Sequence, residues 1–193
     1  IVNFGGTSVI KKHYYSWQDI EKMCTEIVTT MYTSKFTPDY IVGITRGGNI
    51  PATIISNMTG IPCEAIKVSL RDDSKLESSS WMAQHAFGVV PIDEQGVYKS
   101  RFDPHKRKKI LIIDDINDTG RTFNWIKNDW QTNCFPEEDA VWNVIWGASV
   151  KFAVLTENLA SNFDQVNFYA HEINKAEDDV WLVYPWEHVG KYE

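Results

Sequence analysis

The chain has few cysteines, no excess of positive charge and no long apolar run. Its three cysteines are far apart and form neither a CxxC motif nor a Cys/His metal spacing, which indicates reduced thiols. The formal net charge of −7 argues against a general nucleic-acid or anionic-membrane binder. No apolar stretch is long enough to span a bilayer and no signal peptide is visible. We therefore expect a cytoplasmic protein without stable membrane association.

Apolar runs typical of strands alternate with helical patterns along the chain. With 193 residues, 43% of them hydrophobic, residues 1–193 suit a single domain with a sizeable core. Predicted strands occupy residues 40–45, 63–70, 110–114, 150–156 and 166–169. Predicted helices occupy residues 16–33, 49–58, 119–131 and 136–146, with Ser16 and Asn49 capping the first two. The alternation predicts an α/β domain, with a doubly wound, mostly parallel sheet flanked by helices.

The least regular part of the sequence spans residues 71–109. It combines a serine run with scattered charges and glycines, and we expect a long flexible loop with a hairpin near residues 87–98. So long a connection is usually functional or mobile. Because it carries Arg71 and Lys75, this segment is a candidate lid over a ligand site.

The stretch ILIIDDINDTGRT, residues 110–122, ends a buried strand with two adjacent aspartates and then a Thr-Gly turn. A calcium loop is excluded because its twelfth position holds Ile126 and a strand precedes it. The chain also lacks GxxxxGK[ST] and GxGxxG motifs. A phosphate cradle at a strand-to-helix turn fits better, with backbone amides of residues 118–122 and the Thr119 and Thr122 hydroxyls around the phosphate. The two strand-end carboxylates would then face ribose hydroxyls or Mg²⁺.

The same stretch resembles throughout the phosphoribosyl pyrophosphate (PRPP) signature of type I phosphoribosyltransferases. Upstream, IVGITRGGNIPATIISNMTGIP at residues 41–62 is similar to that family's pyrophosphate loop. An arginine brings a forked cation there, and two glycines let backbone amides approach a diphosphate. In the family the arginine–glycine bond is strained or cis. The resemblance implies that PRPP is bound by Arg46, Gly47, Gly48, Asp114, Asp115, Asp118, Thr119, Gly120, Arg121 and Thr122, with Asp115 as the Mg²⁺ ligand.

Asp118 and the C-terminal part of the chain indicate which base the protein would use. In family members that use 6-oxopurines, an aspartate at this position lies beside purine N7 and serves as the catalytic proton-transfer group. The alternative is that Asp118 only caps the following helix.

The segment VWLVYPWEHV, residues 180–189, is similar to the purine-covering segment of bacterial xanthine-guanine phosphoribosyltransferases. This resemblance implies a base-covering hood over residues 157–193, with Trp181 stacking on the base, Leu182 covering it and backbone near Leu182 and Glu187 reading the purine 2-position. The chain departs from the family at one position. Family members that use 6-oxopurines have a lysine there that donates to the 6-oxygen, whereas this chain has Asn158. Its amide can donate to an oxygen or accept from an amino group, which leaves the base open.

The resemblance implies an Mg²⁺-dependent enzyme that transfers a 5-phosphoribosyl group from PRPP to a purine. The expected base is a 6-oxopurine (guanine, xanthine or hypoxanthine), and pyrophosphate is released in purine salvage. A homodimer or homotetramer without a nucleic-acid partner is expected. Two alternatives stay open. One is a PRPP-sensing regulatory or scaffold protein on the same fold, and the other is a transferase for a different nitrogenous base.

Overall fold

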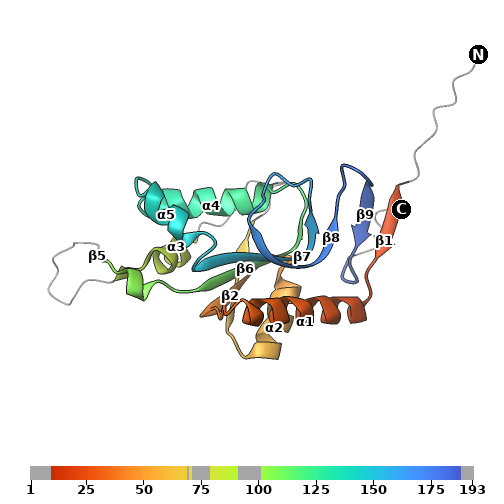
Figure 1. Ribbon diagram of the computed structural model, residues 1–193, viewed down its shortest axis with the longest axis horizontal. Helices are drawn as coiled ribbons and strands as arrows, with labels where there is room; N and C mark the ends of the chain where they lie inside the picture. Colours follow the sequence, from red (N-terminus) through yellow and green to blue (C-terminus); the bar gives the residue numbers. More distant parts are fainter. Residues whose placement is uncertain (1–9, 69, 71–78, 91–100, 188–193) are drawn as a thin grey trace, which may run out of the picture.

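The fold is centred on a five-stranded sheet in which every neighbouring pair of strands is parallel, with the order β3-β2-β6-β7-β8. The computed structural model describes residues 10–68, 70, 79–90 and 101–187. The strands of this sheet are β2 (Tyr40–Thr45), β3 (Cys63–Lys67), β6 (Ile110–Asn117), β7 (Val150–Asn158) and β8 (Val166–Ile173). The predicted α/β class with a mostly parallel sheet is confirmed (Figure 1).

Helices cover both faces of this sheet (Figure 1). One face carries α1 (Trp17–Thr33) and α2 (Asn49–Thr59), and the other carries α3 (Ser80–Phe87), α4 (Arg121–Asn133) and α5 (Asp139–Ile145). In β6, Ile110 and Ile112 pack toward α3–α5, whereas Leu111 and Ile113 pack toward α1 and α2. Burial on both faces explains the uninterrupted apolar run of this strand. Within the described residues, no helix has the length and apolar character needed to cross a membrane.

The starts of the first two helices differ in how they are capped. Ser16 caps α1 as predicted, since its Oγ accepts from Asp19 N at 3.1 Å and the Asp19 carboxylate accepts from Ser16 N at 2.7 Å. The prediction that Asn49 caps α2 was wrong, because Gly48 is the N-cap and makes no side-chain bond. Asn49 is instead the first helical residue, and its amide donates to Thr45 Oγ1 at 3.2 Å.

The prediction of a long loop over residues 71–109 was wrong at residues 80–87. Residues 80–87 form α3, whose Met82, Ala83, Ala86 and Phe87 are buried in the core. The hairpin predicted near residues 87–98 is confirmed in part: β4 (Val89–Val90) runs antiparallel to β5 (Arg101–Phe102), whose residues lie beyond the predicted range. A short 3-10 turn, η2 (Pro104–Lys106), follows. Residues 71–78 and 91–100 lie outside the described part, so the lid carrying Arg71 and Lys75 stays a prediction.

A small second sheet stands beside β8 at one end of the molecule (Figure 1). It pairs β1 (Lys11–Tyr14) with β9 (Val180–Val183) in parallel. β1 was not predicted, because all four of its side chains are exposed and give no apolar alternation. The predicted strand at residues 63–70 ends at Lys67, whereas β6, β7 and β8 extend beyond their predicted ends by three, two and four residues.

Candidate active site

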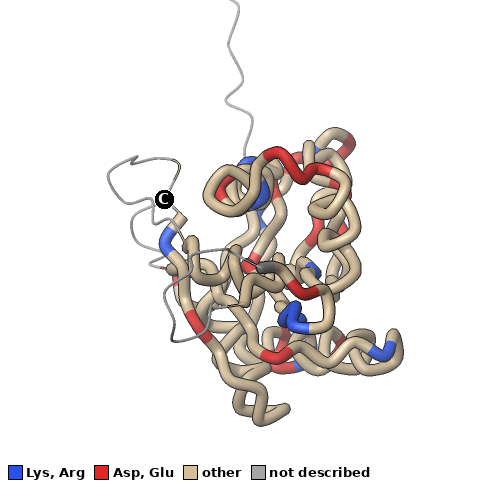
Figure 2. The backbone as a smooth tube through the Cα atoms, turned by 90° about the vertical axis from the view of Figure 1, so that its left-hand side faces the viewer, with Lys and Arg blue, Asp and Glu red and all other residues tan. Residues whose placement is uncertain are grey.

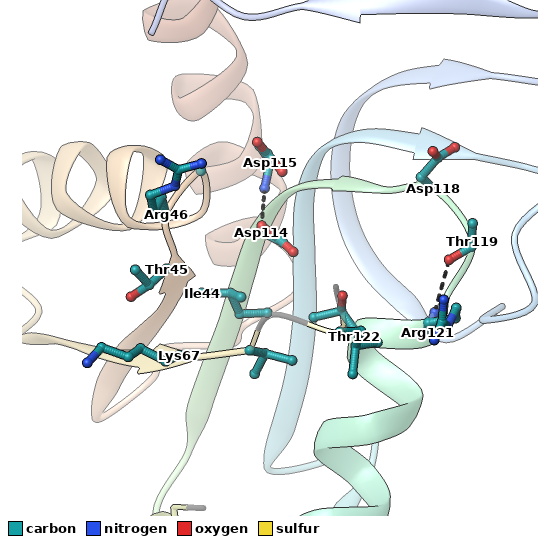
Figure 3. A pocket seen from close by; sticks show the side chains of 13 residues that line it. Ile44, Thr45, Arg46, Lys67, Asp114, Asp115, Asp118, Thr119, Arg121 and Thr122 are labelled. Carbon is teal, nitrogen blue, oxygen red and sulfur yellow. Dashed lines mark hydrogen bonds between the residues drawn. The ribbon is translucent and has the colours of Figure 1, made fainter. Parts of the chain in front are cut away.

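A cavity of about 790 Å³ opens where β2, β3 and β6 end. Crevices at the carboxyl ends of parallel strands are the usual ligand sites of open α/β sheets. Of the ten residues predicted to bind PRPP, all except Gly48 and Gly120 line it. Its lining comprises Ile44, Thr45, Arg46, Gly47, Lys67, Val68, Leu70, Asp114, Asp115, Asp118, Thr119, Arg121 and Thr122 (Figure 3).

The loop after β2 lies directly against the end of β6. A Cβ built on Gly47 would be 2.0 Å from Asp115 Oδ2, and one on Gly48 would be 2.5 Å from the backbone oxygen of Ile113. Glycine is therefore required at both positions, which brings the Arg46 loop and the aspartates to one wall of the cavity. The cis peptide bond lies between Thr45 and Arg46, one position before the bond that the family resemblance implied.

Asp114 and Asp115 form a pair of buried carboxylates. Asp114 Oδ1 accepts from the Asp115 backbone N–H at 2.9 Å, and Asp115 Oδ1 accepts from the Ile116 N–H at 2.9 Å. Burial, together with the neighbouring Asp115 charge, raises the pKa of Asp114 well above its ordinary value, and burial also raises the pKa of Asp115. Two carboxylates held together in this way favour a cation or hydroxyl donors as their ligand.

The turn after β6 leads into the N-terminus of α4. Gly120 adopts a left-handed conformation with φ of 82°, and a Cβ there would meet the backbone N of Phe163 at 2.5 Å. α4 begins at Arg121, two residues after the predicted start, and Thr119 Oγ1 accepts from the Arg121 N–H at 3.4 Å. The start of α4, with the Thr122 side chain, borders the cavity (Figure 3). Such a helix start is a ready anion site.

Asp118 contacts two residues from distant segments. Asn158, at the end of β7, donates from Nδ2 to the Asp118 backbone oxygen at 2.9 Å and to Oδ1 at 3.3 Å. Lys175, in the connection between β8 and β9, places Nζ 2.9 Å from Asp118 Oδ1. Lys175 was not predicted, because an ion pair between residues so far apart leaves no local pattern.

The other predicted base-binding residues lie apart from the cavity lining. Trp181 is 42% exposed on β9, whereas Leu182 is buried in the core beneath α1. The Glu187 N–H donates to Tyr184 O at 3.0 Å. Burial and the Asp115 charge raise the pKa of the Glu187 carboxyl above its ordinary value. Tyr184 OH donates to Asp115 O at 3.1 Å, a contact with the site that the sequence did not indicate.

Comparison with known proteins agrees with this geometry. The family described as "Phosphoribosyl transferase domain" matches residues 10–182, and the chain belongs to that family. Xanthine phosphoribosyltransferase 1 of Saccharomyces cerevisiae is 26% identical over 92% of this chain and 90% of its own length. Hypoxanthine-guanine phosphoribosyltransferase of Schizosaccharomyces pombe is 24% identical over 90% of this chain and 88% of its own length.

Solved structures share the fold. A purine phosphoribosyltransferase from Pyrococcus horikoshii superimposes with a TM-score of 0.59, 22% identity and coverage of 93% of this chain and 95% of its own. The xanthine-guanine-hypoxanthine phosphoribosyltransferase of Helicobacter pylori gives a TM-score of 0.59, 16% identity and coverage of 93% and 96%. The arrangement of sheet and helices is therefore that of purine phosphoribosyltransferases of known structure.

A buried glutamate behind the turn provides a test of the site's electrostatics. Glu157 is 7% exposed and accepts from Asn117 Nδ2 at 3.0 and 3.2 Å. Burial raises its pKa from 4.5 to about 7. Because folding raises the pKa of Glu157, the protonated side chain stabilises the protein at a pH below its unfolded-state pKa. This stabilisation is lost as the pH rises through the folded-state pKa. The Glu157→Gln variant keeps a side-chain oxygen that can accept from Asn117 but does not ionise, so it should not lose this stabilisation at high pH.

We therefore expect the melting temperature of Glu157→Gln, relative to wild type, to rise between pH 5 and pH 8. For a chain of this size, each kcal/mol of change in the free energy of unfolding shifts the melting temperature by about 2–4 °C. Thermal unfolding followed by circular dichroism at both pH values measures the difference. Glu26→Gln, on the exposed face of α1, is the control and should shift the melting temperature equally at both pH values. If the difference in melting temperature between Glu157→Gln and wild type does not grow with pH, the raised pKa of Glu157 is contradicted.

Proposed function

We propose that this protein transfers the 5-phosphoribosyl group of PRPP to a 6-oxopurine and releases pyrophosphate, a reaction of purine salvage. The observation that carries the proposal is the meeting of three elements around one cavity. These are the Arg46–Gly47 loop, the Asp114–Asp115 pair and the turn at residues 118–122. Membership in the phosphoribosyl transferase domain family and the purine transferases among the relatives support it.

The proposed pose follows from charge and hydrogen bonding. The 5′-phosphate lies in the turn against the amides at the start of α4 and the Thr119 and Thr122 hydroxyls. Asp114 accepts from the ribose hydroxyls. Arg46, with backbone amides of Gly47 and Gly48, binds the pyrophosphate, and Lys67 adds positive charge from the lining of the cavity.

In the reaction, a ring nitrogen of the purine forms a bond to ribose C1 as the bond from C1 to the pyrophosphate oxygen breaks. The transition state resembles an oxocarbenium ion, so positioning, stabilisation of the leaving group and exclusion of water provide the rate enhancement. Asp118 accepts the N7 proton that the purine loses, and is therefore the proposed catalytic base. Trp181, Leu182, Glu187 and Asn158 remain predicted base contacts.

The aspartate pair is also the proposed Mg²⁺ site, with Asp115 as the protein ligand. Within the described residues no group of three or more His, Cys, Asp or Glu side chains is placed to hold a metal ion. That fits Mg²⁺, which binds through one or two carboxylates and takes its other ligands from substrate oxygens and water. When bound, the ion would neutralise charge on the pyrophosphate.

A nucleic-acid-binding regulator on the same fold receives no support from the charge distribution. Acidic positions are spread over several elements of the described chain (Figure 2). A homodimer or homotetramer and a cytoplasmic location stay predictions.

The first test offers guanine, hypoxanthine, xanthine and adenine separately with PRPP and Mg²⁺. We expect pyrophosphate release with at least one 6-oxopurine and far slower release with adenine. Chelation of Mg²⁺ should abolish turnover, and Mg²⁺ added in excess should restore it. Adenine as the best substrate would refute the 6-oxopurine assignment. PRPP binding without turnover of any base would favour the sensor.

The second test separates proton transfer from substrate binding. Asp118→Asn should lower kcat by roughly 10²–10⁴-fold, the usual contribution of a general base, while PRPP binding is retained. Arg46→Ala should weaken both PRPP binding and turnover, because it removes the cation from the leaving group. Steady-state kinetics and calorimetric titration of PRPP give the two quantities. Equal loss of PRPP affinity and kcat in Asp118→Asn would exclude the proton-transfer role.

A further inference from the structure

Asp115 lies beyond the last residue of β6 that pairs with β2. The pairing of these strands ends at Gly43 and Ile113, two residues before Asp115. The Asp115 carboxylate leaves no space for a Cβ on Gly47, so it lies directly against the Arg46 loop. A strand end that has lost one neighbour needs other groups to fix its backbone. The position of the Asp115 backbone decides where this carboxylate stands in the cavity.

The hydroxyl of Tyr184 donates to this backbone. Tyr184 directly follows β9 and is 2% exposed, and its OH lies 3.1 Å from Asp115 O. A backbone oxygen only accepts hydrogen bonds, so the single hydrogen of the hydroxyl serves this contact. Burial, followed by the Asp115 charge, raises the pKa of Tyr184 well above its ordinary value. The hydroxyl therefore keeps its hydrogen at physiological pH and remains a donor.

Other side chains fix the position of the Tyr184 hydroxyl. Thr156 Oγ1, on β7 and fully buried, lies 3.0 Å from Tyr184 OH and 3.1 Å from Tyr15 OH. Tyr15 OH also contacts Nδ1 of His171 on β8. The ring of Tyr184 stacks with those of Tyr15 and Trp186, at centroid distances of 5.1 and 4.9 Å. Ring packing and hydrogen bonds thus restrict Tyr184 together.

We infer that Tyr184 is a positioning residue, which holds the Asp115 backbone so that the carboxylates of Asp114 and Asp115 face the ribose of PRPP. The inference rests on the proposed function. Tyr184 is not part of the cavity lining, so it acts on the ligand only through Asp115. Side chains that orient metal-binding groups typically contribute 10- to 100-fold to metal affinity or activity.

A purely structural role of Tyr184 would give different kinetics. Loss of folded protein lowers the apparent kcat and leaves the KM values for both substrates unchanged. Misplaced carboxylates weaken the binding of PRPP instead, which raises the KM for PRPP. The KM for the base should not follow, because the predicted base contacts lie on other residues. The two KM values therefore distinguish positioning from stability.

The experiment compares Tyr184→Phe, Thr156→Val, Thr156→Ser and Tyr40→Phe with wild type. Calorimetric titration gives the PRPP affinity in the presence of Mg²⁺, and steady-state kinetics gives the KM for PRPP and for hypoxanthine. We expect Tyr184→Phe to weaken PRPP binding and to raise the KM for PRPP about 10-fold, the lower end of the usual range. The KM for hypoxanthine should change little. Thr156→Val should have a smaller effect of the same kind, and Thr156→Ser, which keeps the hydroxyl, should retain most of the wild-type affinity.

Tyr40→Phe is the matched control. Tyr40 is 8% exposed and its OH lies 3.1 Å from His85 Nδ1, so this variant also removes a hydrogen-bonded hydroxyl from a buried tyrosine. Tyr40 stands at the start of β2, whereas the cavity opens where that strand ends. The PRPP affinity of Tyr40→Phe should therefore equal that of wild type.

The inference is overturned if Tyr184→Phe binds PRPP as tightly as wild type, or if it lowers kcat and leaves both KM values unchanged. It is also overturned if Tyr40→Phe weakens PRPP binding as much as Tyr184→Phe. If Tyr184→Phe does not fold, the Thr156 variants decide, and equal PRPP affinity of Thr156→Val and Thr156→Ser contradicts the inference. Failure of the proposed function is a separate result, namely no pyrophosphate release by wild type with any of the four bases, and the PRPP titrations still test Tyr184 in that case.

Discussion

The site depends on the close approach of two neighbouring strand ends. β2 and β6 are adjacent and parallel, with Gly43 opposite Ile113 in register, so the loop after β2 and the carboxylates of β6 emerge side by side. A Cβ on Gly47 would lie 2.0 Å from Asp115 Oδ2, and no side chain fits between them. Any larger residue would push the aspartate away from the Arg46 loop. The proposed binding of pyrophosphate and ribose by one cavity therefore requires this glycine.

Buried hydrogen bonds support the aspartates from the far side. Tyr184 OH lies 3.1 Å from Asp115 O and 3.0 Å from Thr156 Oγ1, and Tyr15 OH lies 3.1 Å from the same threonine oxygen. This network connects β7 and the residues that directly follow β1 and β9 to the Asp115 backbone. Ionised carboxylates are costly to bury, and the raised pKa of Asp114 reflects that cost. The network fixes the backbone that carries them, which orients the pair toward the cavity.

Local patterns predicted most of the fold and eight of the residues that line the cavity. The apolar run of β6 and the Ser16 cap depend on neighbouring residues, and the structure has both. α3 was missed because its short apolar pattern follows a serine run, and β1 because it buries no side chain. Lys175 could not be predicted, since its partner Asp118 reaches it only through the order of strands in the sheet.

The central claim is that the turn at residues 118–122 binds the 5′-phosphate of a ribose, with the adjacent carboxylates facing the sugar. A crystal structure of the protein with ribose 5-phosphate bound tests it most directly. The account predicts the phosphate against the backbone amides of the Thr119 turn, with the ribose hydroxyls toward Asp114 and Asp115. A phosphate bound at the Arg46 loop or elsewhere, with the turn empty, would contradict it.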